Sequence, residues 1–188
     1  MIKYAKIIDQ ETGLCEVGTG TNSDFYKSIG MTQLDVEQSD IDNNWYLSEL
    51  CPHKTDEEKL KEAKDAKFQE ANLKAFQYLE SGEAVFEFEE GKSIEATDGN
   101  IAKLGLALVN FILQQDYTST IEWNTKENEN VQLNASQLQV IVAGLQAIQA
   151  EVWTIKFPAY NTQIEEAQTV EDVEAIIIDY SETESEDE

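Results

Sequence analysis

The stretch that decides the fold is Thr118–Phe157, which reads TSTIEWNTKENENVQLNASQLQVIVAGLQAIQAEVWTIKF. Its first half holds two short runs of alternating apolar and polar residues around a polar turn, a pattern typical of a two-stranded hairpin. Ile121 and Trp123 are the apolar residues of the first run, and Val131 and Leu133 are those of the second. We expect both pairs to share one face of the ribbon, where each cross-strand contact contributes about 0.2–1 kcal/mol.

A long helix is predicted directly after this hairpin. Asn134 and Gln137 have the spacing of a capping box, in which each side chain accepts a hydrogen bond from the other residue's backbone N–H. Apolar residues then recur at helical spacing, at Leu138, Ile141, Val142, Leu145, Ile148, Val152 and Ile155. We expect Pro158 to end or kink the helix, because it lacks an amide hydrogen and clashes with the preceding turn. Thr169 then starts a short final helix.

A second hairpin and a second helix precede that stretch. Phe86 and Phe88 alternate with glutamates, and Gly91 turns the chain back. A helix is predicted from Asn100 to Gln115. Its apolar residues are Ile101, Leu104, Leu106, Leu108, Val109, Phe111, Ile112 and Leu113. Since these residues cover more than one side of the helix, we expect it to be largely buried.

Residues 55–82 are predicted to form a spacer helix. Thr55 and Glu58 have capping-box spacing, and Ser81-Gly82 supplies a stop. The apolar stripe consists of Leu60, Ala63, Ala71, Ala75, Tyr78 and Leu79. A stripe so narrow and rich in alanine favours a spacer, or one side of a homo-oligomer formed through residues 56–80, over a core helix.

The first 54 residues are predicted to form a small β-rich docking module. Tyr4–Ile8 and Leu14–Val17 form a hairpin around a Glu-Thr-Gly turn, and Trp45–Leu47 is a closing strand. Thr32, followed three residues later by Asp35, has the spacing to cap a short turn of helix. A unit of this size buries little surface alone, so we expect it to dock on something.

These elements together predict an α+β fold with four parts. The parts are the β-rich module 1–54, the spacer helix 55–82, an α+β domain 83–180 and an acidic tail 181–188. Within the α+β domain the expected order is hairpin, helix, hairpin and long helix. The tail, SETESEDE, has no apolar anchor, so we expect it to be solvated.

The charge of the chain argues against some classes of partner. It holds 13 basic and 38 acidic residues, for a net charge of −25, and every basic residue is a lysine. Phosphate backbones are bound by clustered Lys and Arg, and bidentate phosphate recognition depends most on Arg. We therefore expect no nucleic-acid and no membrane partner. High like charge confers solubility and attracts basic partners.

Cysteine usage and hydropathy favour a reducing cytoplasm. Cys15 and Cys51 are the only cysteines, and they lack the CxxC spacing of a structural zinc site. The opening residues, MIKYAKIID, lack the apolar core of a signal peptide, and we find no 18-residue apolar run for a membrane span.

No pattern of catalytic or ligand-binding residues stands out, so we predict no cofactor and no metal site. Cys51 and His53 are close in sequence, but neighbours in the extended chain that Pro52 favours point apart, which favours a loop role. The run Asp40–Asn44 lacks the glycine and terminal glutamate of an EF-hand loop. The segment 18–20, Gly-Thr-Gly, lacks the third glycine of a dinucleotide site.

Four aromatic residues are the candidates for partner contact: Phe25, Tyr26, Trp45 and Tyr46. Aromatic side chains are enriched among the residues that dominate protein interfaces. The same side chains also suit the core of a small sheet, and the sequence leaves both roles open.

A set of positions between Glu83 and Tyr180 carries a family resemblance. The positions are Ile121, Trp123, Val131, Leu133, Leu138, Leu145, Ala167, Thr169, Val173 and Ile176. In this pattern the chain resembles a phage-encoded domain of uncharacterised function found in tail-fibre and tail-fibre-assembly proteins. The segments KYAKIID, CEVGTGTN, FYKSIGM and WYL look like the start of gut-phage proteins encoded near tail-fibre genes. The resemblance implies a fold and a genomic context, and no catalytic residues are carried over.

These observations favour a non-enzymatic tail-fibre-associated protein that serves as an assembly chaperone or accessory of the receptor-binding fibre. Its partner would be a tail-fibre or other virion protein, met in the host bacterial cytoplasm during assembly. One alternative is a permanent virion component of the tail fibre, baseplate or head decoration. Another is an acidic nucleic-acid mimic that inhibits a host defence protein.

Overall fold

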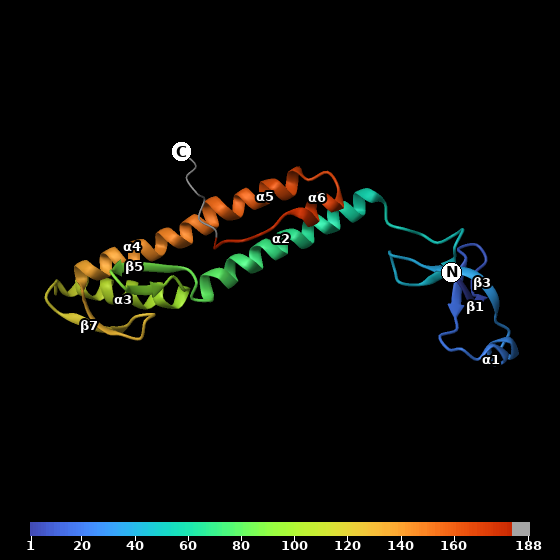
Figure 1. The fold of residues 1–188 in the computed structure, drawn as a ribbon, viewed down its shortest axis with the longest axis horizontal. Helices are drawn as coiled ribbons and strands as arrows, with labels where there is room; N and C mark the ends of the chain where they lie inside the picture. The colour runs from blue at the N-terminus through green and yellow to red at the C-terminus, as the bar shows by residue number, and fades with distance from the viewer. Residues whose placement is uncertain (182–188) are drawn as a thin grey trace. The chain divides into compact units, whose positions relative to one another are not determined.

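The computed structural model describes residues 1–181, and its fold is α+β. The chain divides into two compact units, Met1–Lys61 and a second unit that begins at Glu62. Figure 1 shows mainly strands in the first unit and mainly helices in the second. The predicted acidic tail 181–188 lies outside the described residues except for Ser181, whose N–H and hydroxyl donate to the Asp179 carboxylate.

The first unit is a closed barrel of four antiparallel strands in the order β1-β2-β4-β3. Its elements are β1 (Ile2–Ile7), β2 (Leu14–Val17), α1 (Ser23–Ser28), β3 (Thr32–Gln38) and β4 (Trp45–Leu47). The predicted hairpin and closing strand are confirmed. Ala5, Cys15 and Val36 are the buried residues of the barrel core, and larger, partly buried side chains such as Leu34 and Trp45 pack against them.

The predicted helical turn at Thr32 is wrong. Residues 32–38 form strand β3, in which Leu34 and Val36 pack in the barrel core while their neighbours are exposed. The short helix lies earlier, at α1, where the Asn22 side chain provides the cap. Alternation of apolar and polar residues places a whole strand in the barrel, and this outweighs the local capping preference at Thr32.

The second unit contains two hairpins and a set of helices in the predicted order. Helix α2 (Asp56–Glu80) spans the boundary between the units. The other elements are β5 (Val85–Glu89), β6 (Lys92–Glu95), α3 (Asp98–Gln114), β7 (Thr120–Asn124), β8 (Asn130–Asn134), α4 (Ala135–Glu151), α5 (Phe157–Glu166) and α6 (Val170–Ala175). The register of β7 and β8 places Ile121 opposite Leu133 and Trp123 opposite Val131, as predicted.

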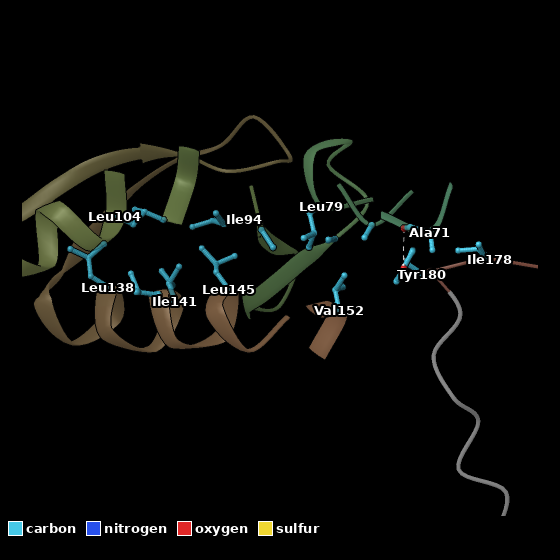
Figure 2. Packing of buried hydrophobic residues seen from close by; sticks show 14 of the residues in the cluster. Ala71, Leu79, Ile94, Leu104, Leu138, Ile141, Leu145, Val152, Ile178 and Tyr180 are labelled. Carbon is cyan, nitrogen blue, oxygen red and sulfur yellow. Dashed lines mark hydrogen bonds between the residues drawn. The ribbon is translucent and has the colours of Figure 1, made fainter. Parts of the chain in front are cut away.

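Helix α4 lies at the centre of the second unit's core. Asn134 and Gln137 form the predicted capping box, with N···O distances of 3.1 and 3.0 Å. Figure 2 shows the buried residues of α4 packed against those of α3 and β6: Leu138, Ile141, Leu145, Leu104 and Ile94. A Cβ atom at Gly144 would collide with the ring of Phe86, so glycine at this position lets β5 pack closely on α4.

Pro158 does not end the helix, contrary to one of the two predicted outcomes. Residues Val152–Lys156 form a π turn that continues into α5, and the Phe157 N–H bonds to the Val152 carbonyl, five residues back. The Thr154 hydroxyl donates to the Ala150 carbonyl at 2.6 Å. The widened turn directly before the proline accommodates its ring and its missing amide hydrogen, so helical structure continues.

The C-terminal part of α2 belongs to the core of the second unit, which the spacer prediction did not include. Ala71, Ala75 and Leu79 are buried in that core. In Figure 1 the helix runs beside α5, and the Lys64 Nζ donates to the Glu165 carbonyl at 2.7 Å. Three residues of the apolar stripe that favoured a spacer or a homo-oligomer are therefore buried in the core of the second unit.

An extended segment, 176–180, lies against α2 and α5. Lysine side chains donate to its backbone carbonyls in three pairs, Lys67 to Ile176, Lys74 to Ile178 and Lys156 to Tyr180. The Tyr180 hydroxyl donates to the Ala71 carbonyl at 3.1 Å, and burial raises the pKa of this hydroxyl to about 12. The lysines thus supply hydrogen bonds that a neighbouring strand would otherwise supply to the segment, and the Tyr180 hydroxyl joins the segment to the backbone of α2.

Helix α3 is much less buried than predicted. Leu104 is its one fully buried residue, and Ile101, Leu108 and Phe111 are partly buried against the core. Helix α4 packs on this side of α3, and within residues 1–181 no second helix packs extensively on the other side. The prediction of a largely buried helix is wrong because apolar residues occur around most of α3, whereas α4 covers one side of it.

Candidate protein-binding surfaces

Phe25 and Tyr26, two of the four predicted contact residues, lie together on the outside of the barrel. The Tyr26 ring stacks on Tyr4 of β1 at a centroid distance of 5.8 Å, and the Phe25 ring meets it edge-on at 5.6 Å. A Cβ atom at Gly18 would collide with the Tyr26 ring, which explains the small residue in that loop. Phe25 is 54% exposed, so within this aromatic group its side chain is the one that a partner protein could contact.

Trp45 and Tyr46 lie on opposite faces of strand β4. Trp45 packs against the barrel core, and the Lys3 Nζ lies 3.8 Å from its ring centroid. The Tyr46 hydroxyl donates to the Asp42 carboxylate at 2.7 Å. Since β4 is not a neighbour of β1 in the barrel, these two residues do not join Phe25 and Tyr26 in one patch.

Cys51 and His53 both lie near the carboxylates of Glu37 and Asp40. The His53 ring nitrogens lie 3.8 Å from a Glu37 oxygen and 3.6 Å from an Asp40 oxygen. Burial raises the pKa of the Cys51 thiol, and the charges of Glu37, Asp40 and Asp42 raise it further. A thiol with a raised pKa holds little of the thiolate that nucleophilic chemistry needs.

The Asp40–Asn44 run is a turn closed by its own carboxylate. The Asp42 carboxylate accepts from the Asn44 N–H at 3.0 Å and from the Tyr46 hydroxyl, and these hydrogen bonds lower the pKa of Asp42. Asn43 takes the left-handed conformation, with φ of 61°. Within the described part of the chain, no group of three or more His, Cys, Asp or Glu is placed to hold a metal ion.

An open apolar hollow lies where β5 meets α4. It has a volume of about 310 Å³ and is lined by Phe88, Glu89, Ser136, Gln137 and Val140. Val140 is 59% exposed there, although it belongs to the central core helix. Strand β5 pairs with β6 along one edge, and no strand among residues 1–181 pairs with its other edge. Phe88 and Glu89 line the hollow, so it lies beside a strand that is paired along one edge among the described residues.

A second apolar surface covers the side of α3 that faces away from α4. We call it the α3 outer face and define it by Ala102, Leu106, Val109, Asn110, Leu113 and Tyr117, all of them exposed. Leu106 is 64% and Leu113 is 75% exposed. No charged residue occurs between Leu104 and Gln115, which is unusual on a chain with a net charge of −25.

Neither surface was predicted from the sequence. The α3 outer face was missed because its apolar residues were assigned to the core. The signal that could have revealed it was the lack of charge on every side of the helix, since an apolar helix of this type requires cover on more than one side. The hollow depends on a close approach of β5 to α4 that no local pattern indicates.

One helical segment, Ala135–Glu166, has the length and composition of a membrane span. In its most apolar window 28% is buried, because Leu138, Ile141 and Leu145 pack into the core of the second unit. One such helix is weak evidence for a membrane span, because the test considers length and composition alone.

Comparison of the chain with protein-family models, with curated proteins and with solved structures gives no match. The resemblance to a phage tail-fibre-associated domain therefore stays a prediction.

Proposed function

We propose that this chain is a non-enzymatic tail-fibre-associated protein that covers an apolar strand segment of the fibre during assembly. The sequence resemblance supplies the context of the proposal. The observation that carries it is the apolar hollow lined by Phe88 and Val140, together with a strand β5 that is paired along one edge among the described residues.

The shape of this site fits an extended segment. An added strand would bond to the free edge of β5, and one of its apolar side chains would enter the hollow. A fibre that trimerises exposes such strands before it closes, and uncovered strand edges aggregate. Binding at this site would keep the unassembled fibre soluble.

The charge around the hollow specifies the partner further. Glu89 lines the hollow, and Glu90 follows it in the chain. Lys92 pairs with Glu89 at 3.0 Å and offsets part of this charge. A fibre segment with apolar residues and flanking lysine or arginine complements such a border.

Co-expression with the fibre encoded beside this gene tests the proposal. Wild-type chain should raise the yield of soluble trimeric fibre, and Val140→Asp should abolish the gain because it places a charge in the hollow. The matched control is Gln139→Asp, which adds the same charge at the preceding position of α4, where the side chain is exposed. Equal fibre yield with and without the wild-type chain would contradict the proposal.

Mass spectrometry of purified particles separates the chaperone from the permanent virion component. A chaperone leaves the fibre and should be absent from the particle. A structural component would be present in a fixed ratio to the fibre, and that result would replace the chaperone role by the structural one.

A further inference from the structure

We propose that a polar pocket in the second unit binds a neutral small molecule with several hydroxyl groups, of the size of a monosaccharide. The pocket has a volume of about 220 Å³. Its lining includes Glu95 of β6, Asn100 in the first turn of α3, Asn124 at the end of β7, and Asn128 in the turn after β7. This site does not rest on the proposed function, because it shares no lining residue with the hollow at Val140.

Hydrogen bonds between the turn after β7 and the rest of the unit hold the pocket in shape. The Lys126 N–H donates to the Ser93 carbonyl at 3.0 Å. The Ser93 N–H and hydroxyl donate in turn to the Glu127 carboxylate. The Lys126 Nζ donates to the Gly82 carbonyl at 2.7 Å. The walls are therefore fixed before a ligand enters, so that little conformational freedom is lost on binding.

The polar side chains that line the pocket are largely unused within the fold. Among residues 1–181, the Glu95 carboxylate and the carboxamides of Asn124 and Asn128 make no hydrogen bond or ion pair. Asn100 donates an amide hydrogen to the Glu95 carbonyl at 3.1 Å, and its carboxamide oxygen accepts none from the described residues. Three carboxamides and one carboxylate thus line the pocket with hydrogen-bonding capacity that a ligand can use.

The mixture of these groups selects the class of ligand. A carboxamide both donates and accepts hydrogen bonds, as a hydroxyl group does, so three of them suit a molecule with several hydroxyl groups. The Glu95 carboxylate disfavours an anion, and the Lys126 ammonium group is already bonded to the Gly82 carbonyl. A calcium ion takes about six to eight oxygen ligands, often from several carboxylates, whereas Glu95 supplies the one carboxylate of this lining.

The affinity should be low, because hydrogen bonds alone would hold the ligand. The surface inside the pocket is almost entirely polar, so Trp123 offers no ring face on which a sugar could stack. The volume also lies below the roughly 300–1,000 Å³ of pockets for drug-sized ligands. We expect a dissociation constant on the order of 1 mM.

Two-dimensional NMR titration of the isotopically labelled full chain tests the site, with glucose, galactose, mannose and N-acetylglucosamine as probes. At least one of these sugars should shift the side-chain amide signals of Asn100, Asn124 and Asn128 in a saturable manner. The side-chain signals of Asn72, at an exposed position of α2, should not move. Inorganic phosphate and putrescine, added at the same concentrations, should leave all four sets of signals unchanged, because the site does not suit an anion or a simple cation.

Two variants remove one carboxamide each. Asn124→Ala and Asn128→Gly should each raise the dissociation constant about two- to tenfold, as expected for the loss of one hydrogen bond. Glycine is the replacement at position 128 because the backbone there has a φ of 62°. The matched control is Asn130→Ala, which makes the same change as Asn124→Ala on the paired strand, at an exposed position outside the lining. This control should bind as the wild type does.

The outcomes that would overturn the proposal are specific. One is a chain whose pocket signals none of the four sugars shifts. Another is a shift produced by phosphate or putrescine and by none of the sugars. A third is sugar binding that Asn124→Ala and Asn128→Gly both leave unchanged, since the ligand would then lie elsewhere.

Discussion

Helices α2 and α3 show that burial in this protein follows the available cover more closely than it follows hydrophobicity. Helix α2 contains twelve charged residues, yet Ala71, Ala75 and Leu79 are buried. Helix α3 contains two charged residues, yet Leu104 alone is buried. The segment 176–180 and α5 cover α2 closely, whereas α4 covers only one side of α3.

The difference teaches that small residues can be core residues and large apolar ones can be surface residues. Alanines let the backbone of α2 lie close to its neighbours, so that Tyr180 can reach the Ala71 carbonyl. The apolar side chains of the α3 outer face are exposed among residues 1–181. We infer that these side chains are retained for binding, because contiguous exposed apolar surface marks interaction sites.

The largest expected effect is a difference in the free energy of unfolding between variants on the buried and on the exposed side of α3. Leu104→Ala should reduce the free energy of unfolding by about 2–5 kcal/mol, because it leaves a cavity in the core. Leu106→Ala makes the same chemical change on the exposed side and should cost no more than about 0.5 kcal/mol. Urea unfolding at low protein concentration checks both values. Equal losses would mean that α3 is covered on both sides.

The next effect concerns α2. Ala71→Leu should cost about 1–3 kcal/mol, because the larger side chain overpacks the contact with the 176–180 segment. Ala66→Leu, at an exposed position of the same helix, is the control and should be nearly neutral. Thermal unfolding of the two variants gives the comparison. If both were tolerated equally well, α2 would be the free spacer that its sequence indicates.

A smaller effect is expected at the start of α4, which supports α3. Asn134→Ala should cost about 1 kcal/mol, because it removes the oxygen that accepts from the Gln137 N–H. Ser136→Ala, at an exposed position of the same first turn, should change the free energy of unfolding much less. Chemical denaturation measures the two. A cost at Ser136 as large as at Asn134 would contradict the role of the capping box.

The smallest effect concerns the contact between the two hairpins. The Ser93 hydroxyl and N–H donate to the Glu127 carboxylate and lower the pKa of Glu127 to about 2. Because the folded pKa lies below the ordinary value of 4.5, this contact stabilises the fold above pH 4.5, and its contribution is lost as the pH falls toward 2. Ser93→Ala should raise the pKa of Glu127 toward 4.5, measured by NMR titration. An unchanged pKa would show that the hydroxyl is not the cause.

Local patterns predicted most of the fold. The predicted capping pairs at Thr55 and Asn134 form in the structure, because caps depend on residues three positions apart, and a short helix begins after Thr169 as predicted. Both hairpins of the second unit form where alternation and turn residues predict them. These features are encoded within short windows, so no knowledge of tertiary neighbours is needed.

Features that depend on neighbours were not predictable. The capping spacing at Thr32 gave no sign that β3 completes a barrel. The π turn before Pro158 is a response of the helix to its own sequence and packing, and no pattern distinguishes it from a helix end. Of the four predicted contact residues, Trp45 packs against the barrel core and Phe25 is 54% exposed on α1, a distinction that depends on how the barrel closes.

Photo-crosslinking from the hollow tests the central claim most directly. A photoreactive phenylalanine analogue replaces Val140, and the chain is irradiated during particle assembly in the host. The control places the analogue at Gln69, an exposed position of α2. We predict a crosslink from position 140 to the tail-fibre protein and none from position 69. A crosslink from position 140 to a host nuclease, or no crosslink from it at all, would contradict the account.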